Sequence, residues 1–541
     1  MKNLVLLLTP LAIAYAAQVQ LGNTTLVGKD LVSQGLEFYG GIPFAEAPVG
    51  KLRLKPPVPK TSLDVATLNA TDFGASCLQP RTQSPISEDC LFVNVLKPAD
   101  VASDASLPVA VFIYGGANVV ESPFHLNASA FVAKSVSRGT PIIYASFNYR
   151  LGPLGFPAGS EAAAKGALNV ALKDQLAALE WIRDNIAAFG GDKDKITLLG
   201  WSGGAIFISL HYLNLQIEKY ARAAILQSGA PTLVFDEGRS QGFWDDFIAG
   251  IPECASYAKN QSIDCLQNEQ FNSTQLLGPM TAALGKSGQQ FPWTGILDGR
   301  DGVIPDWPSE QYKQGHFSNI PLMFGNVLDE GSRFTWGIPD EKTVQDAIVA
   351  NLTTHRAAEE EQLREAVDQL LTFYPDDAAA GSPFGTGNET FGLTPQAKQY
   401  AAIIGDIIFQ SARRAFTKAV AGAGVKAFGY LYTFPERLGT VPPSMGVQHG
   451  AEVDYVFGLP TVNSTDGTKL SEQLMDYWLS FITTLDPNDG IGSERPVWPE
   501  YASGSETILQ LNGPENSTVI PDDYRAEGIA FINGNPGLFS H

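Results

Sequence analysis

Residues 196–210, ITLLGWSGGAIFISL, decide the fold. The first four form a short apolar run that predicts a buried strand, and the last six predict an apolar helix. Between them, GWSGG at 200–204 has the G-x-S-x-G pattern of a sharp strand-to-helix turn. Side chains at Gly200 and Gly204 would collide with neighbouring backbone, so glycine is required at both. The turn presents Ser202 at the carboxyl end of a strand, which makes it the candidate nucleophile.

A serine hydroxyl is a weak nucleophile at neutral pH and needs a base. The chain has six histidines. In folds with this turn the order along the chain is nucleophile, acid, base. That order excludes His125, which precedes Ser202, and His211, which lies on the helix behind the turn. Three others fall in a surface turn, in a charged helix and at the last position, so His449, in a loop after a strand, is the predicted base.

The acid should follow a strand between the nucleophile and the base. Residues 321–325, PLMFG, predict such a strand, and Asp329 and Glu330 come soon after it. The residues alone do not decide between these two carboxylates.

A serine nucleophile that attacks a carbonyl group also needs backbone N–H donors directed at the negative charge that develops on the carbonyl oxygen. Gly203 follows the nucleophile directly and supplies one. The loop Tyr114-Gly115-Gly116-Ala117 follows an early predicted strand, and its glycines allow close approach to a substrate. We expect the remaining donors there.

The rest of the chain predicts an α/β fold. Predicted strands alternate with predicted helices, which favours a large, mostly parallel sheet covered on both faces. We expect one domain with insertions at the carboxyl edge of the sheet. The predicted strands are 91–96, 109–114, 141–149, 223–227, 321–325 and 427–434, and the main predicted helical regions are 168–188, 235–290, 341–373 and 470–485.

The first 16 residues predict a secretory signal peptide. Lys2 precedes a short apolar run, and Ala14-Tyr15-Ala16 has the small-residue pattern of a cleavage site. The run is too short to span ~30 Å of hydrocarbon. We therefore expect residues 17–541 to form a secreted domain with no stable membrane anchoring.

Cysteines and glycosylation sequons fit an extracellular protein. The chain has four cysteines, Cys77, Cys90, Cys254 and Cys265, and an even number favours disulfides there. Four cysteines can be connected in three ways. The two local disulfides, Cys77 with Cys90 and Cys254 with Cys265, would each close a small loop. Nine Asn-x-Ser/Thr sequons are candidate glycosylation sites: Asn23, Asn69, Asn127, Asn260, Asn272, Asn351, Asn388, Asn463 and Asn516.

The net charge is −21 and the isoelectric point about 4.7. Such an acidic surface repels phosphate backbones, so we expect no nucleic-acid partner. The cysteine spacings are not those of zinc knuckles. We expect no metal and no cofactor, a small-molecule ester as substrate, and a monomer ahead of an oligomer.

Several ordered motifs resemble the type-B carboxylesterase/lipase family of α/β-hydrolases, which includes cholinesterases and secreted fungal lipases. They are GIPFAEAPVGKLRLKPP from 41, SEDCLFVNVLKP from 87, NYRLGPLGF from 148, the run 167–204, DGRDGVIPDWPSE from 298, DEG from 329 and HGAEVDYVFG from 449. The resemblance covers nearly the whole mature chain and implies the α/β-hydrolase fold. It implies that Glu330 is the acid, that Gly116, Ala117 and Gly203 are the oxyanion donors, and that the two local disulfides form.

The chain departs from the family pattern near the nucleophile. Ala117 stands where the family usually has a third glycine, Trp201 replaces a glutamate, and Gly203 replaces an alanine. The segment between Cys77 and Cys90, LQPRTQSPISED, is short and polar, whereas fungal lipases carry a longer flap there. A lid needs an apolar face for a lipid interface, so we expect an open site without strong interfacial activation.

The predicted function is a secreted serine esterase that acts through an acyl-enzyme on soluble or aromatic esters, such as feruloyl esters. A triacylglycerol lipase or sterol esterase is the alternative. A non-catalytic adhesion protein of the same fold is a remote alternative. Such members of the family typically lack part of the triad, whereas Ser202, Glu330 and His449 are all present here.

Overall fold

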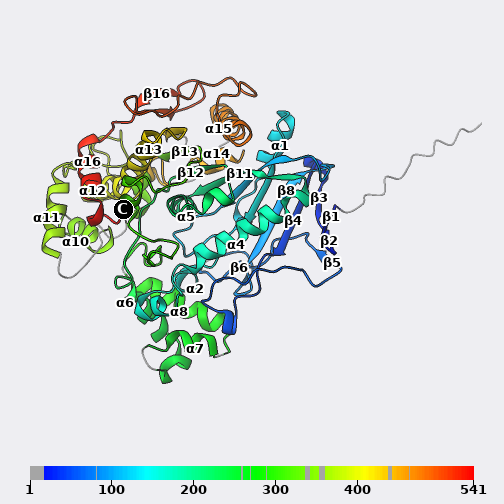
Figure 1. Ribbon diagram of the computed structural model, residues 1–541. Helices are drawn as coiled ribbons and strands as arrows, with labels where there is room; N and C mark the ends of the chain where they lie inside the picture. The colour runs from blue at the N-terminus through cyan, green and yellow to red at the C-terminus, as the bar shows by residue number, and fades with distance from the viewer. Residues whose placement is uncertain are drawn as a thin grey trace, which may run out of the picture.

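The computed structural model describes residues 17–80, 82–257, 260–268, 270–287, 289–335, 341–352, 360–435, 441–461 and 464–541. The predicted signal peptide, 1–16, lies outside these residues. The described chain forms a large sheet between layers of helices (Figure 1).

The main sheet has 11 strands in the order β16-β15-β14-β13-β12-β11-β9-β10-β8-β4-β3. Neighbours from β10 to β15 pair in parallel, and the pairs at both ends are antiparallel. The prediction of a mostly parallel sheet is confirmed. The strands of the chain are β1 (Gln18–Leu21), β2 (Thr24–Val27), β3 (Lys29–Leu31), β4 (Leu36–Pro43), β5 (Thr67–Asn69), β6 (Ser76–Cys77), β7 (Ile86–Ser87), β8 (Phe92–Pro98), β9 (Leu107–Ile113), β10 (Ile143–Phe147), β11 (Gly191–Trp201), β12 (Ala223–Gln227), β13 (Leu322–Val327), β14 (Ala427–Tyr432), β15 (Thr507–Leu511) and β16 (Thr518–Pro521).

Helices cover the sheet on both faces because its central strands are mostly apolar. Every residue of β10, β12, β13 and β14 is buried. The helices are α1 (Ser129–Ser137), α2 (Gly152–Gly155), α3 (Gly159–Ala164), α4 (Val170–Asn185), α5 (Gly203–Leu213), α6 (Gln241–Ala249), α7 (Ser262–Asn268), α8 (Ser273–Lys286), α9 (Pro308–Lys313), α10 (Glu341–Leu352), α11 (Glu360–Leu371), α12 (Pro395–Gly405), α13 (Ala412–Gly422), α14 (Val453–Val456), α15 (Thr465–Thr484) and α16 (Ala526–Gly534).

The core centres on α5, the helix that follows the nucleophile turn. All of its residues are buried, as expected for a helix that is apolar on every side. It packs against β9, β11 and β12. In Figure 1, α4 and α5 lie below the sheet, whereas α1 and α15 lie above it and contact each other.

Insertions leave the sheet after β12 and β13. The first carries α6 to α8, which form a separate group at the bottom of Figure 1, and the second carries α10 to α12. The sequence did not predict β15 and β16, which extend the sheet beyond β14. Both are short. β15 has buried Ile508, Leu509 and Leu511, whereas β16 at the edge is exposed or half-buried along its length and has no strong apolar pattern.

Candidate active site

The nucleophile turn is fixed by backbone packing. Ser202 follows β11 directly and has φ 54° and ψ −126°, in the left-handed half of conformational space. Its N–H donates to the carbonyl of Gln227 at the end of β12, at 2.8 Å. A Cβ at Gly204 would lie 2.1 Å from the carbonyl oxygen of Ile113, and one at Gly200 would lie 2.8 Å from the Ala205 nitrogen. The requirement for glycine at both positions is confirmed.

His449 lies between the other two predicted catalytic residues. Its Nε2 is 2.8 Å from Oγ of Ser202, and its Nδ1 is 2.5 Å from Oε2 of Glu330. Since a carboxylate only accepts, Nδ1–H donates to Glu330 and Nε2 is left to accept the serine proton. The structure thus brings together Ser202 from the turn after β11, Glu330 from the turn after β13 and His449 from a distant loop.

The two carboxylates that the residues alone could not separate have different contacts. Glu330 faces His449, and its second oxygen accepts from the N–H of Val327 at 2.9 Å. Asp329 instead accepts from the N–H groups of Val447 and Phe384, at 2.6 and 2.8 Å. Asp329 therefore ties the histidine loop to the acid turn, while Glu330 meets the imidazole.

The acid turn packs tightly against a helix. Glu330 begins the short helix η7 (Glu330–Phe334), and the next residue, Gly331, touches α12. A Cβ at Gly331 would lie 1.9 Å from the carbonyl oxygen of Ala401. The glycine of the DEG motif is explained by this contact.

The oxyanion loop, residues 115–122, lies directly against the nucleophile. A Cβ at Gly115 would lie 2.6 Å from Cβ of Ser202. Gly116, Ala117 and Asn118 all have positive φ, at 86°, 52° and 64°. Within the described residues, the N–H groups of Gly116, Ala117 and Gly203 donate to no other group, which leaves them available to a substrate oxygen.

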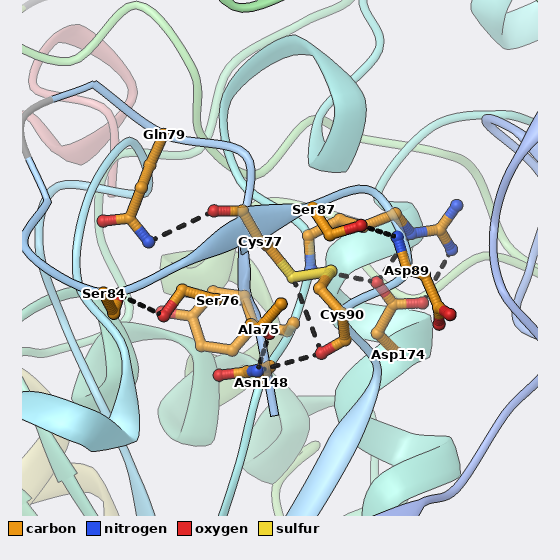
Figure 2. The surroundings of a disulfide bond; sticks show 12 residues. Ala75, Ser76, Cys77, Gln79, Ser84, Ser87, Asp89, Cys90, Asn148 and Asp174 are labelled. Atoms are coloured by element: carbon orange, nitrogen blue, oxygen red, sulfur yellow. Dashed lines mark hydrogen bonds and ion pairs between the residues drawn. A yellow bond between two sulfur atoms is a disulfide. The ribbon is translucent and has the colours of Figure 1, made fainter. Parts of the chain in front are cut away.

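A side chain from the first disulfide loop holds the oxyanion loop. Gln79, which is buried, accepts from the N–H of Glu121 at 2.7 Å and donates to its carbonyl at 2.9 Å. The same amide donates to the carbonyl of Cys77 at 3.2 Å (Figure 2). Asn148 closes the base of the disulfide loop by donating to the carbonyls of Ala75 and Cys90, both at 2.9 Å.

Asn118 explains why Gly203 replaces the usual alanine. The side chain of Asn118 is buried, and its amide donates to the carbonyl of Trp293 at 3.0 Å. A Cβ at Gly203 would lie 2.7 Å from Oδ1 of Asn118. The asparagine thus fills the space that an alanine methyl would need.

Aromatic rings surround the imidazole of His449. The ring centroids of Phe409, Trp201 and Phe334 lie 4.7, 5.7 and 5.7 Å from it. Phe409 belongs to a π-helix, η9 (Asp406–Ser411), a type of element that is frequent at functional sites. These rings restrict the imidazole and offer negatively polarised faces to its cationic form.

A neutral carboxyl lies behind the triad. Burial raises the pKa of Glu452 to about 8, and the nearby Glu330 carboxylate adds to the shift. Its Oε1 lies 3.2 Å from the hydroxyl of Tyr430. The raised pKa favours the protonated form of Glu452 at neutral pH.

Comparison with known proteins decides the family. The carboxylesterase family matches residues 16–532. The chain belongs to the carboxylesterase family. It is 32% identical to "Lipase 1" of Geotrichum candidum, over 96% of each chain, and 31% identical to "Secreted lipase 1" of Botryotinia fuckeliana, over 92% of this chain and 90% of that one. It is 28% identical to a "Secreted triacylglycerol lipase" of Gibberella zeae, over 95% of this chain and 89% of that one.

A solved structure shows the same fold. The crystal structure of Aspergillus niger EstA has a TM-score of 0.83 and covers 97% of this chain and 99% of its own, at 24% identity. The predicted α/β-hydrolase fold, a single domain with insertions, is confirmed, and the protein is a carboxylic ester hydrolase. Because the relatives above are named lipases, the comparisons favour the triacylglycerol lipase alternative over soluble or aromatic esters.

Other predicted features lie away from the site. The structure contains both local disulfides, Cys77–Cys90 and Cys254–Cys265. Among the described residues, no helix has the length and apolar character to cross a membrane, and no group of three or more His, Cys, Asp or Glu is placed to hold a metal. Asn463 lies outside the described residues and Asn351 is half-buried. The remaining sequon asparagines are exposed: Asn23, Asn69, Asn127, Asn260, Asn272, Asn388 and Asn516.

Sequence reasoning missed the residues that support the site. Gln79, Asn118 and Phe409 contact the site from segments far from residues 200–204. Asn118 directly follows the predicted oxyanion loop Tyr114-Gly115-Gly116-Ala117, and this position was the signal that could have indicated its role. For Gln79 and Phe409 no local pattern indicated a role.

Proposed function

We propose that this family member is a secreted serine lipase that works through an acyl-enzyme. The observation that carries the proposal is the position of His449 between Ser202 and Glu330, at 2.8 and 2.5 Å. A nucleophile, a base within hydrogen-bond reach and a third group that orients the base are the requirements for nucleophilic acyl transfer.

The chemistry follows from these positions. His449 takes the proton of Ser202 as the hydroxyl oxygen attacks the ester carbonyl, and the N–H groups of Gly116, Ala117 and Gly203 stabilise the oxyanion. His449 then gives the proton to the leaving alcohol, and an acyl-serine remains. Water enters, loses a proton to His449 and releases the acid, while Glu330 stabilises the imidazolium throughout.

The proposed substrates are acylglycerols. The names of the fungal relatives, lipases and a triacylglycerol lipase, support this class. The names of the Botryotinia and Gibberella proteins also support secretion. The absence of glutamate at position 201, where Trp201 packs on the imidazole, argues against cationic alcohols such as choline.

We further propose that the enzyme needs no lipid interface for activity. The first disulfide spans only 13 positions, and the described part of its loop is held against the oxyanion loop by Gln79. This polar loop offers no apolar face that could act as a lid. Soluble and aromatic esters therefore remain a second class of substrate.

A substrate series tests the proposal. We expect tributyrin, p-nitrophenyl butyrate and p-nitrophenyl palmitate to be hydrolysed, with no sharp increase in rate above the solubility limit of tributyrin. Ser202→Ala should lose activity by at least about 10⁴-fold, whereas Ser33→Ala, on the surface, should match the wild type. A Ser202→Ala protein that still hydrolyses p-nitrophenyl butyrate would refute the mechanism. Activity on methyl ferulate without activity on glycerides would show that aromatic esters, and not acylglycerols, are the substrates.

A further inference from the structure

A cavity of about 410 Å³ lies away from the residues of the triad. It is formed by β3, β4, β8 and β10 together with residues 71–73 and 123–129, which lead into α1. The volume is within the ~300–1,000 Å³ range of small-molecule sites. The residues of the triad do not line it.

Three phenylalanines form one wall of this cavity. The rings of Phe38 and Phe73 lie 4.8 Å apart, and those of Phe73 and Phe124 lie 5.9 Å apart, between centroids. Phe73 and Phe124 remain 36% and 48% exposed. Neighbouring exposed apolar rings are typical of a surface that binds a ligand or a partner.

Polar residues also line the cavity. Asn94 and Ser146 are 3% and 2% exposed, and the Asn94 oxygen accepts from the N–H of Gly41 at 3.0 Å. Asp72 and Lys29 are exposed and offer charged groups to a polar ligand. A sugar has hydroxyl and amide groups for the polar residues and an apolar ring face for the phenylalanines, so it matches both.

A sugar attachment site borders the cavity. Asn127, in the sequon Asn-Ala-Ser, is exposed and is part of the cavity lining. Its Oδ1 accepts from the N–H of Ser129 at 3.0 Å. That bond fixes the side chain and uses the oxygen, whereas a glycan attaches to Nδ2.

We propose that Asn127 carries an N-linked glycan whose first sugar packs on Phe124 and occupies this cavity. The inference rests on the proposed secretion, because the donor, a lipid-linked diphosphate oligosaccharide, is found in the secretory pathway. A bond forms between Nδ2 and the sugar C1, the bond from C1 to the diphosphate oxygen breaks, and Nδ2 loses one proton. The glycan then covers two exposed rings and stabilises the fold.

Asn23 provides an internal comparison. It borders a larger groove of about 900 Å³ between the small N-terminal sheet and α4. The aromatic residues of that groove, Phe44 and Trp181, are 1% and 7% exposed, so a glycan on Asn23 would cover little apolar surface. A glycan there should have little effect on stability.

The test uses the full chain secreted from a yeast host. Ser129→Ala removes the sequon but keeps Asn127 and its bond to the backbone N–H of residue 129, whereas Ser129→Thr keeps the sequon. We expect mass spectrometry of glycopeptides to find Asn127 occupied in the wild type and in Ser129→Thr. Ser129→Ala should lower the Tm by about 2 °C or more, and Asn23→Gln should not change it.

Enzymatic trimming separates the first sugar from the rest of the glycan. Endoglycosidase H leaves one N-acetylglucosamine on each asparagine, and the Tm should be retained. Complete removal by peptide N-glycosidase should lower the Tm as Ser129→Ala does. Phe124→Ala loses its packing on Phe73 in either chain, so it should lower the Tm in both, but by more in the glycosylated chain than in Ser129→Ala, because only there does it also lose the contact with the sugar.

The outcomes distinguish this inference from the proposed function. If other sequons are occupied and Asn127 is not, the inference is wrong and secretion stands. If the chain is recovered from the medium but no sequon is occupied, the inference is wrong and secretion stands, whereas a chain that never reaches the medium under its own first 16 residues contradicts the proposed secretion. If Asn127 is occupied but Ser129→Ala and Asn23→Gln have equal Tm values, the glycan projects into solvent and the cavity is not its site.

Discussion

The nucleophile turn and the oxyanion loop lie side by side at the active site but are held in place differently. The turn is fixed by backbone atoms of the sheet: Gly204 faces the carbonyl of Ile113, and Ser202 bonds to Gln227. The oxyanion loop is held by the side chain of Gln79, about 40 residues earlier in the chain, and by its own Asn118. One element is built into the core and the other is attached to it by side chains.

This difference predicts two kinds of response to substitution. Backbone atoms of a packed sheet cannot move away from an added methyl group, so changes in the turn should be severe. Side chains can rotate or be truncated, so changes at the oxyanion loop should lower the rate in steps while the fold survives.

Gly204→Ala tests the turn and should have the largest effect. The added Cβ would lie 2.1 Å from the carbonyl oxygen of Ile113 and 2.6 Å from that of Tyr114. We expect little soluble protein, and a kcat lowered by at least about 10²-fold in what remains, since Ser202 must shift with the helix. Soluble yield, thermal unfolding and hydrolysis of p-nitrophenyl butyrate measure this. Gly278→Ala is the control, because its methyl on α8 would meet nothing within 4 Å. Equal behaviour of both variants would contradict a rigid turn.

Gln79→Met tests the oxyanion loop and should have the next largest effect. Methionine keeps the length of the side chain but removes its hydrogen bonds to Glu121. We expect kcat to fall by about 10- to 100-fold, because displacement of the N–H donors weakens stabilisation of the oxyanion. KM should change little, and the affinity for a tetrahedral boronic acid inhibitor should fall in parallel with kcat.

The matched control for this substitution is Gln267→Met. Gln267 also donates to a backbone carbonyl, that of Arg53 at 2.8 Å, and lies two residues from the second disulfide. It should leave kcat unchanged. A loss of Tm in Gln79→Met with unchanged inhibitor affinity would mean that Gln79 acts on stability alone.

A double-mutant cycle tests the packing between the two elements. In Gly203→Ala the new Cβ would lie 2.7 Å from Oδ1 of Asn118, which is the end of a side chain. We expect kcat/KM to fall by about 10-fold in Gly203→Ala and by a similar factor in Asn118→Ala. The double variant should resemble one single variant, because removing the amide makes room for the methyl. Additive losses in the double variant would show that the two residues do not share this space.

The same difference explains what the sequence could predict. The strand, glycines and helix of residues 196–210 are adjacent in the chain, so the turn and Ser202 followed from local pattern. His449 followed from elimination, but the choice of Glu330 over Asp329 came only from family resemblance, because both follow β13. The structure separates them by their contacts with His449 and Val447.

Local sequence patterns could not predict the contacts that support the active site. Gln79 and Phe409 reach the site through tertiary packing, and the residues that they contact there are distant from them in the chain. The weak strands β15 and β16 join the sheet only because β14 is already in place to pair with β15.

Glu452→Gln has the smallest expected effect on the rate and tests, through stability, the side of the turn that faces the core. Because burial raises the pKa of Glu452 to about 8 from an ordinary 4.5, the folded chain keeps a proton that the unfolded chain releases in this range. The wild type therefore loses stability as pH rises from about 4.5 to 8. Glutamine cannot ionise, so the Tm of the variant relative to wild type should increase between pH 5 and pH 8 and level off above that.

Thermal unfolding at pH 5, 6.5, 8 and 9 measures this, with Glu500→Gln, at an exposed position, as the control. A constant difference in Tm across this range would mean that burial does not raise the pKa of Glu452 in the folded chain. An increase confined to Glu452→Gln would show that burial keeps Glu452 protonated in the folded chain.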